Sequence, residues 1–331
     1  MVLVNRFILL LLLILPLFAC ASDEPLTRVA FGSCNRQDKP QTIWPIVSRN
    51  QPQLWIWTGD IIYGDTEDMD VLRQKYDLLK HNPAYTAFRQ DTSVIGVWDD
   101  HDYGLNDGGK EFGPREQSQQ VLLDFLDEPK DSPRRKRAGV HAAYTYGKPG
   151  KQVKVILLDG RYHRDHPDEE DADILGEGQW AWLEQELSQS QAQIHLIACG
   201  IQIVASDHPF EKWANFPNSQ KRLYDLIGKL KVPGVIFISG DRHLSEISRN
   251  SSTPVGYPLY DITSSGMTHS YSTFNGEPNR LRVGKVWPNK HFGMIEIDWD
   301  ASPVQIELRI HDLKNKPRIK ETLSLDELQP R

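Results

Sequence analysis

Three aspartates and one histidine occupy four consecutive positions, 99–102, within the stretch VIGVWDDHDYGLND at residues 94–107. Carboxylates held this close together raise one another's pKa and repel one another, so a folded chain needs a cation to hold them. The stretch therefore predicts a cation at this point of the chain, and the first question is what that cation is.

Other reactive side chains follow apolar stretches in the same way. They are Cys34, Asp60, Asp159 with Arg161, and Asp241 with His243. Each alone has an ordinary explanation, such as a turn residue, a core thiol or a satisfied histidine. In open α/β sheets, however, ligands bind outside the carboxyl ends of the strands. Carboxylates, a thiol and an imidazole gathered at one sheet edge are the donors of a metal site.

The elements that must position these residues can be recognised from hydrophobic patterns. Buried strands are expected at residues 28–34, 53–60, 93–102, 153–161, 193–202 and 234–243. Helical spacing of apolar residues is found at residues 69–81, 115–126, 178–190 and 219–230. Strands that alternate with helices predict an α/β layered sheet.

The C-terminal part of the chain has a different pattern. Strand-like stretches at residues 257–265, 291–300 and 304–312 follow one another without helices between them. This favours a mixed or antiparallel second sheet, packed on the first within a single domain over residues 28–331. The basic run at positions 134–137 is typical of a solvated loop, with a rim for a polyanionic substrate as the alternative.

The N-terminus is typical of an export signal. Arg6 precedes an apolar run that ends in LFAC, and the apolar block at residues 7–15 is short for a membrane span of about 20 residues. LFAC resembles the lipobox of bacterial lipoproteins. We therefore expect a signal peptide over residues 1–19, a lipid on Cys20 and a tether over residues 20–27, which would anchor an exported protein to a membrane in the periplasm or at the cell surface. An ordinary cleaved signal and an uncleaved anchor are the alternatives.

The composition limits the partners of the chain. It has 45 acidic and 38 basic residues, a net charge of −7, which argues against a general attraction to nucleic acid or anionic lipid. No specific nucleic-acid-binding module is expected. Cys34 and Cys199 could form a disulfide in an oxidising compartment, although the position of Cys199 inside an apolar run favours a buried thiol.

Taken together, the motifs resemble those of the PhoD-type alkaline phosphatase and phosphodiesterase family, within the binuclear metallophosphatases of calcineurin-like fold. The matching motifs, in the order of the family over residues 28–270, are FGSC (Cys34), GDIIYGD (Asp60, Tyr63), WDDHD (Asp100, His101), LDGR (Asp159, Arg161), SGDRH (Asp241, His243) and ITSSG. The combination is specific, whereas GD or DH alone is not. The resemblance implies a four-layer α/β/β/α sandwich of two mixed sheets, with a metal centre between the sheet edges.

The resemblance also implies a ligand set. Asp60 would bridge two metal ions. A site for Fe(III) would be completed by Cys34, Tyr63 and His243, and a site for Ca(II) by Asp100, Asp241 and Asn106, although other divalent metals are possible. Thiolate and phenolate suit a highly charged metal, whereas carboxylate and amide oxygens suit calcium.

The expected activity is hydrolysis of phosphoric monoesters or diesters by in-line attack of a metal-activated water on phosphorus. His101 would protonate the leaving group or form a hydrogen bond in the transition state, and Asp102 would orient His101. Arg161 would hold the phosphoryl group with its planar guanidinium, and Asp99 would be structural.

Two alternatives remain at this level. The same centre could hydrolyse another class of ester, although a neutral ester gives Arg161 nothing to pair with. The chain could also be a non-catalytic, calcium-binding surface lipoprotein, although such a site needs neither His101 nor Arg161. The oligomeric state cannot be predicted from the sequence.

Overall fold

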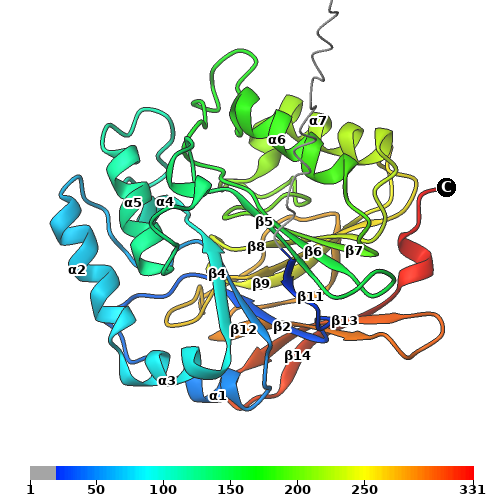
Figure 1. The fold of residues 1–331 in the computed structure, drawn as a ribbon, viewed down its shortest axis with the longest axis horizontal. Coiled ribbons are helices and arrows are strands. Elements are labelled where there is room, and N and C mark those ends of the chain that lie inside the picture. Colours follow the sequence, from blue (N-terminus) through cyan, green and yellow to red (C-terminus); the bar gives the residue numbers. More distant parts are fainter. Residues whose placement is uncertain (1–19) are drawn as a thin grey trace, which may run out of the picture.

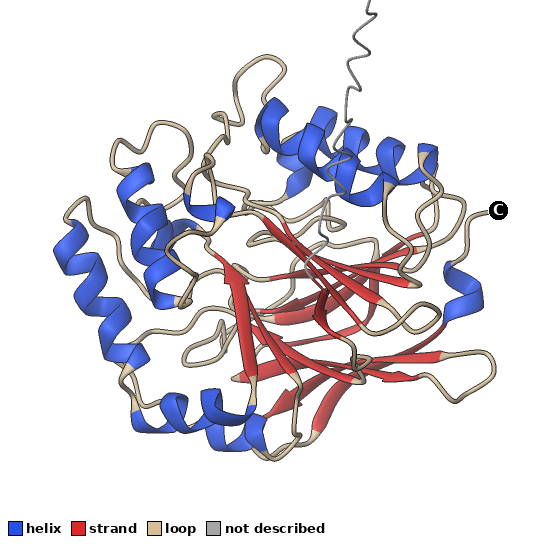
Figure 2. Cartoon of the chain, in the orientation of Figure 1, coloured by secondary structure: helices blue, strands red, loops and turns tan. Residues whose placement is uncertain are grey.

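Two β-sheets face each other at the centre of the molecule, and helices cover their outer faces (Figures 1 and 2). The computed structural model describes residues 20–331. The larger sheet has the strand order β1-β5-β6-β7-β8-β10-β9-β11, and the smaller has the order β14-β13-β12-β2-β3-β4. Helices α6 and α7 lie over the larger sheet, and α1 and α3 lie under the smaller sheet (Figure 1). The four-layer α/β/β/α sandwich predicted from the sequence is confirmed.

The larger sheet is parallel in its middle, from β6 through β7 and β8 to β10. Its strands are β1 (Cys20–Ser22), β5 (Ala142–Tyr146), β6 (Val153–Leu157), β7 (Ile194–Ala198), β8 (Val235–Ser239), β10 (Leu259–Ser264), β9 (Ser245–Asn250) and β11 (Arg282–Trp287). Every residue of β6, β7 and β8 is buried. Parallel strands covered on both faces need such continuous apolar runs, which is why the sequence pattern identified them.

The smaller sheet combines strands from both ends of the chain. Its members are β14 (Pro317–Ser324), β13 (Gln305–Asp312), β12 (His291–Asp298), β2 (Arg28–Gly32), β3 (Leu54–Thr58) and β4 (Ser93–Val97). Strands β2, β3 and β4 are parallel, and the C-terminal strands add to β2 in antiparallel fashion. We expected the strand-like stretches of the C-terminal part to lie together in the second sheet. This is wrong for β10, which pairs with β8 in the larger sheet.

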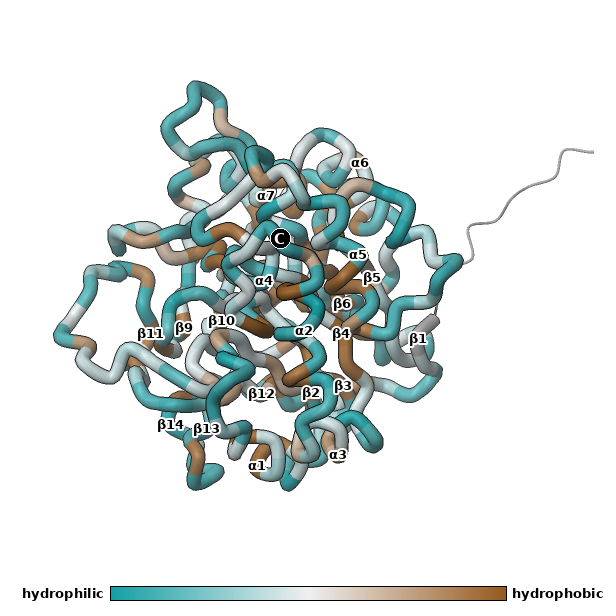
Figure 3. The backbone as a smooth tube through the Cα atoms, turned by 90° about the vertical axis from the view of Figure 1, so that its left-hand side faces the viewer, coloured by the Kyte–Doolittle hydropathy of each residue, from teal (hydrophilic) through white to brown (hydrophobic). Residues whose placement is uncertain are grey.

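Aromatic packing fixes helices α1 (Trp44–Ser48) and α3 (Pro83–Asp91) under the smaller sheet. The ring of Trp44 lies 5.0 Å from that of Trp55 and 5.4 Å from that of Trp57, both on β3, with the planes nearly perpendicular. Phe88 of α3 lies 5.0 Å from Trp44. Figure 3 shows the same segregation over the whole chain, with apolar residues concentrated in the strands and polar residues on the outer loops.

The remaining helices lie beside the sheets or over the larger one. They are α2 (Met69–Lys80), α4 (Asp100–Tyr103), α5 (Arg115–Phe125), α6 (Gly176–Ser188) and α7 (Pro217–Lys229), with short 3₁₀ turns η1 (Pro133–Arg135), η2 (Trp213–Asn215) and η3 (Leu325–Leu328). Four of these helices match the stretches of helical spacing in the sequence to within two residues. The short helices α1 and α4 and helix α3 were not predicted.

The segment expected as a tether starts as a strand. β1 pairs in parallel with β5, because that edge of the larger sheet offers unpaired backbone groups. The expected signal peptide at residues 1–19 lies outside the described residues. In the part of the chain from residue 20 onward, none of the helices has the length and apolarity needed to cross a membrane.

The basic run at positions 134–137 is solvated only in part, since Lys136 is exposed and Arg134 is not. Arg134 is buried, and its guanidinium donates hydrogen bonds of 2.7 Å to the carbonyl oxygens of Gly96 and Val140. Gly96 belongs to β4, which is the edge strand of the smaller sheet. Arg134 therefore closes that edge, and the expectation of a solvated loop is wrong for this residue.

Candidate metal centre

The residues singled out in the sequence meet where the two sheets come together. Cys34 follows β2, Asp60 follows β3 and Asp100 follows β4 of the smaller sheet, whereas Asp241 and His243 follow β8 of the larger sheet. Since the carboxyl ends of parallel strands lie at one edge of a sheet, both sheets present their reactive residues to the same place.

A backbone bridge joins the sheets at this place. Ser33, after β2, forms a parallel bridge with Ser265, after β10. The Ser265 Oγ lies 2.8 Å from the Sγ of Cys34 and accepts a hydrogen bond of 2.7 Å from the backbone N–H of His243. Ser265 therefore sets the distance between two predicted ligands, a role that the sequence motif ITSSG did not reveal.

Four groups of metal-binding side chains overlap at the centre. Within each group the donor atoms lie within 4.8 Å of one another, and the groups are Cys34–Asp60–His243, Asp60–Asp100–His101, Asp99–Asp100–Asp241 and Asp100–Asp107–Glu211. Asp60 belongs to the first two groups, and its Oδ2 lies 3.1 Å from the Sγ of Cys34. Asp60 is thus shared by two groups, which is compatible with the bridging role that the resemblance implies.

The backbone at the predicted ligands adopts an uncommon conformation. Cys34, Asp60, Asp241 and His243 have φ angles of 57°, 48°, 66° and 54°, in the left-handed region that non-glycine residues rarely adopt. Each such residue costs on the order of 1–3 kcal/mol, and such residues cluster at active sites and ligand clamps. The left-handed turns follow the strand ends and bring these side chains together.

Two glycines allow the aspartate cluster to approach the centre. A Cβ on Gly59 would lie 2.3 Å from the Cβ of Asp99, and a Cβ on Gly200 would lie 2.4 Å from its Cγ. Any larger residue at either position would displace Asp99. This contact is the physical reason for the glycine in the GD pair at positions 59–60.

Three buried carboxylates each have one oxygen without a hydrogen-bond donor among the described residues. Oxygen atoms of Asp60 (Oδ1), Asp99 (Oδ2) and Asp100 (Oδ1) are buried without a hydrogen bond from any described residue. Burial raises the pKa of Asp60 well above its usual range, and burial with the nearby charges of Glu211 and Asp100 raises the pKa of Asp241 to about 8. Buried carboxylates are stable when they are paired or coordinate a metal, so this donor set fits metal ions.

Tyr63 lies beside the first of these groups. Its hydroxyl is 3.0 Å from the Nε2 of His243, 2.9 Å from the Nε2 of His269 and 3.5 Å from the Oδ2 of Asp60. Burial raises the pKa of Tyr63 above its ordinary value, so the phenol ionises only if a cation stabilises it. His269 was missed by the sequence reasoning because it lies in an irregular loop after β10.

His101 is oriented by a residue other than the one expected. Its Nδ1 lies 2.7 Å from the Oδ1 of Asp65, the last residue of the GDIIYGD motif. Burial lowers the pKa of His101, but the Asp65 hydrogen bond and the charge of Asp100 outweigh this effect and raise it to about 9. Among the described residues, the Nε2 of His101 has no hydrogen-bond partner, and the ring lines the cavity of the site.

Asp102 does not orient His101, and that prediction is wrong. Its carboxylate accepts backbone N–H bonds from Asp99 (2.7 Å), Asp60 (3.1 Å) and Ile61 (3.2 Å). Burial raises the pKa of Asp102 to about 7, against the opposing effect of these donors. Asp102 therefore holds the end of β3 against the start of α4.

Arg161 does not face the cavity, and its expected role in holding the phosphoryl group is not supported. The side chain is 1% exposed, its Nε donates to the Oδ1 of Asp99 at 2.6 Å, and its terminal nitrogens donate to both carboxylate oxygens of Glu211. Two carboxylates already occupy the guanidinium. Arg161 is thus the cation for Asp99, which is structural as expected, and it also lies 3.9 Å from Asp100, whereas Asp60 and Asp241 have no such partner among the described residues.

Asp159 and Cys199 have structural positions as well. The carboxylate of Asp159 accepts hydrogen bonds from the indole of Trp98 (2.8 Å) and the backbone N–H of Val140 (2.8 Å). Cys199 is a buried free thiol that accepts a bond of 3.4 Å from the indole of Trp213, as the sequence predicted. Cys34 is also a free thiol, so the two cysteines do not form a disulfide.

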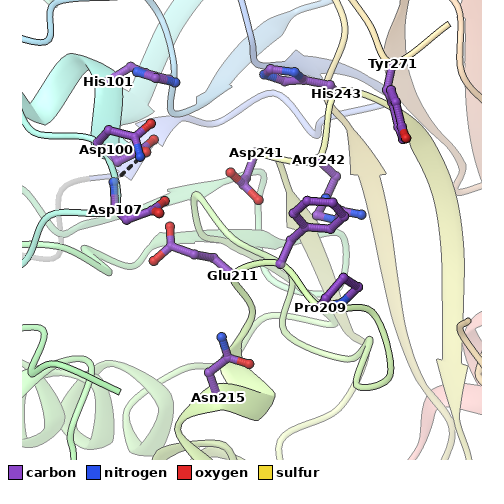
Figure 4. Close-up of a pocket in the computed structure, with 12 residues that line it drawn as sticks. Asp100, His101, Asp107, Pro209, Glu211, Asn215, Asp241, Arg242, His243 and Tyr271 are labelled. Carbon is purple, nitrogen blue, oxygen red and sulfur yellow. Dashed lines mark hydrogen bonds between the residues drawn. The ribbon is translucent and has the colours of Figure 1, made fainter. Parts of the chain in front are cut away.

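A cavity of about 620 Å³ opens onto the centre (Figure 4). Its lining residues are Asp100, His101, Asn106, Asp107, Pro209, Phe210, Glu211, Asn215, Asp241, Arg242, His243 and Tyr271. Figure 4 shows the carboxylates of Asp100, Asp107, Glu211 and Asp241 turned toward one another. Asn106 lies on the cavity wall, as a ligand role requires. Asp107 and Glu211 were not predicted, because they lie in loops without a periodic pattern.

Comparison with known proteins agrees with this geometry. The family model described as PhoD-like phosphatase matches residues 29–258. No curated protein matches the chain. Among solved structures, that of PhoD is similar over 92% of this chain and 70% of its own, with a TM-score of 0.72 and 15% identity.

Two further solved structures share the fold. GAP50, described as the anchor in the inner membrane complex of Plasmodium, has a TM-score of 0.62 at 13% identity, over 93% of this chain and 90% of its own. A dimetal phosphatase from Danio rerio has a TM-score of 0.54 at 14% identity, over 91% of this chain and 100% of its own.

Proposed function

Because the chain belongs to the PhoD-like phosphatase family, we propose that it is an exported hydrolase of phosphoric esters that acts on monoesters or diesters. The observation that carries this proposal is the charge of the cavity. Four carboxylates line it, from Asp100, Asp107, Glu211 and Asp241. Glu211 is paired with Arg161 and Arg164, but the one arginine among the lining residues, Arg242, is already paired with Glu277 and leaves the other three carboxylates in excess. A phosphate ester is an anion, so it enters such a cavity only when metal ions neutralise the carboxylates.

The donor set divides into two sites that share Asp60. One would be formed with Cys34, Tyr63 and His243, and the other with Asp100, Asp241 and Asn106. The ions would supply the positive charge that binds phosphate oxygens and the Lewis acidity that activates water.

The residues of the chain supply orientation and a proton. Asp65 holds the Nδ1 side of His101, so the Nε2 side is available to the cavity. A proton on this nitrogen can pass to the oxygen of the leaving group when the P–O bond breaks. Asp102 and Arg161 keep the supporting loops in place without contact with substrate.

The proposed metals are Fe(III) at the Cys34–Tyr63–His243 site and Ca(II) at the Asp100–Asp241–Asn106 site, with Asp60 shared. The proposal follows from the ligand types, because thiolate and phenolate suit a highly charged ion and oxygen donors suit calcium. Phenolate bound to Fe(III) absorbs visible light, so the concentrated protein should be coloured. Tyr63→Phe should shift or remove the band, whereas Cys199→Ser should leave it unchanged. An active, colourless enzyme that contains zinc alone would disprove the iron assignment and leave the phosphatase proposal intact.

The activity itself is tested on natively purified protein by metal analysis followed by assays with phosphomonoesters and phosphodiesters. We expect turnover of at least one class, loss of turnover with EGTA, and recovery when calcium is restored. Turnover of lactones or carboxylic esters alone would favour another ester class. A metal-loaded protein that turns over none of these esters would instead favour the non-catalytic, calcium-binding alternative.

A further inference from the structure

Two aromatic side chains, Phe210 and Tyr271, stay exposed where they line the cavity, and we call them the aromatic pair. Phe210 is 46% exposed and Tyr271 is 37% exposed. The described residues contain two other exposed large hydrophobic side chains, Leu78 and Leu105, and neither lines the cavity. Burial of an aromatic ring is strongly favourable, so exposed rings beside a reactive centre indicate a surface that a ligand covers.

Phe210 is held in place by the segment that carries two predicted ligands. The guanidinium of Arg242 lies over its ring, 4.3 Å from the centroid, and Arg242 is itself fixed by an ion pair with Glu277. Arg242 stands between Asp241 and His243 in the chain. The ring is therefore preorganised on one face by a cation, and its position relative to the metal centre is set by the same loop.

Tyr271 is tied to the same loop by its backbone. Its N–H donates a hydrogen bond of 2.6 Å to the carbonyl oxygen of His243, and its ring packs edge to face against Phe274 at 6.2 Å. In Figure 4, Tyr271 lies on the same side of the cavity as His243 and Arg242, and His101 and Asp100 lie on the other side. Both members of the pair thus share one wall.

Another part of the cavity wall offers amide groups. The Oδ1 of Asn215 accepts a hydrogen bond of 2.6 Å from Lys212, and no described residue accepts a bond from its NH₂ group. Asn106 lines the cavity too, but its amide oxygen belongs to the proposed calcium site, so the NH₂ group of Asn215 is the donor offered to a ligand. A free amide group can form hydrogen bonds with the polar edge of a heterocycle, whereas a hydrocarbon ring has no polar edge to bond.

We propose that Phe210 and Tyr271 are specificity-determining residues that bind a flat aromatic ring in the ester group of the substrate while its phosphoryl group lies at the metal centre. The inference rests on the proposed phosphoesterase function. The shared chemistry is a flat conjugated ring, which an aryl ester or a nucleoside ester could supply. An alkyl ester lacks the π face that packs against the aromatic pair.

The test compares two esters whose leaving groups have similar acidity. The chemical step is then matched, and the esters differ in whether the leaving group can stack on the aromatic pair. The matched esters are 2-naphthyl phosphate and a fluoroalkyl phosphate whose alcohol is about as acidic as a phenol. A nucleoside 5′-monophosphate, whose leaving alcohol is much less acidic, is compared only between variants. Phe210→Ala and Tyr271→Ala should each lower kcat/KM for the naphthyl ester about 10-fold, mainly through KM, and change the fluoroalkyl ester less than about 2-fold. Tyr271→Phe, which keeps the ring, and Leu78→Ala, which removes an exposed side chain elsewhere, should resemble the unaltered protein.

Binding supplies a readout that is independent of turnover. Calorimetry with 2-naphthylphosphonate on the metal-loaded protein should show the same loss of about 10-fold in Kd for both alanine variants. If the alanine variants also lose kcat/KM on the nucleoside ester, the site accepts flat rings in general. If they lose kcat/KM on the naphthyl ester alone, the site is specific for aryl esters.

The inference is overturned if the alanine variants lose kcat/KM equally on the naphthyl and fluoroalkyl esters, or if they lose kcat/KM on neither ester. If the unaltered protein hydrolyses no phosphate ester at all, the proposed function itself fails, so the two failures are distinguishable.

Discussion

Asp60 is the residue on which the two proposed metal sites depend, because its carboxylate belongs to both donor groups and one of its oxygens has no partner among the described residues. Asp60→Asn keeps the shape of the side chain and removes its charge. We expect metal content to fall and kcat to drop at least about 100-fold, since loss of residues that only support ligands already costs about 10–100-fold. Metal analysis and circular dichroism should show an emptied site in a folded protein. Asp38→Asn, at an exposed ion pair with Arg36, is the matched control. Full activity of Asp60→Asn would remove Asp60 from the centre.

His101 and Asp65 form the second unit at this scale. His101→Ala should keep most of the metal and lose on the order of 10²- to 10⁴-fold in kcat, with larger losses for esters that have poor leaving groups. Asp65→Asn should lower kcat less than His101→Ala does, with the same dependence on the leaving group, because the substitution weakens the contact that orients the Nδ1 of His101. The two losses should not add in the double variant. Additive losses, or a loss that is independent of the leaving group, would mean that Asp65 acts apart from proton transfer.

At the scale of elements, Arg161 joins three loops that follow or precede regular structure. It follows β6, and it pairs with Asp99 just before α4 and with Glu211 in the loop before η2. Arg161→Met leaves the buried carboxylate of Asp99 without its cation, whereas Glu211 keeps its ion pair with Arg164. Breaking a buried ion pair from one side costs about 3–5 kcal/mol.

Urea denaturation should show this loss as a lower free energy of unfolding for Arg161→Met. Lys151→Met, which removes one partner of an exposed ion pair with Asp300, should change stability little. A stable Arg161→Met variant whose only defect is weak substrate binding would restore the phosphate-holding role that the structure does not support.

At the scale of the whole molecule, the N-terminal sequence makes a prediction about attachment to a membrane. The LFAC sequence predicts a lipid on Cys20, and β1 would bring the lipid-bearing residue to the edge of the larger sheet beside β5. Cys20→Ser should abolish lipid attachment and move the protein from the membrane fraction to the soluble fraction, with little effect on kcat. Fractionation and mass spectrometry of the N-terminal peptide check this, with Cys199→Ser as the control. Unchanged processing and membrane retention would disprove the lipoprotein hypothesis.

The sequence by itself determined nine of the fourteen strands of the described residues, the four longest helices and the positions of the candidate ligands at the strand ends. Buried parallel strands need continuous apolar runs and long surface helices need a 3.6-residue repeat, so both leave a local pattern. The reactive residues follow the strand ends, and that position alone brings Cys34, Asp60, Asp100 and the Asp241–His243 pair to one edge.

Only the tertiary structure decided which partner each side chain contacts. Asp102 lies in the one-turn helix α4 and Arg161 in an irregular loop after β6, so spacing does not show that Asp102 turns to the backbone or that Arg161 turns into the core. Strand pairing is also set by contacts distant in sequence, which is why the C-terminal strands divided between two sheets. His269 and Glu211 reach the site from irregular loops, whose conformation depends on the packed sheets beneath them and leaves no periodic trace in the sequence.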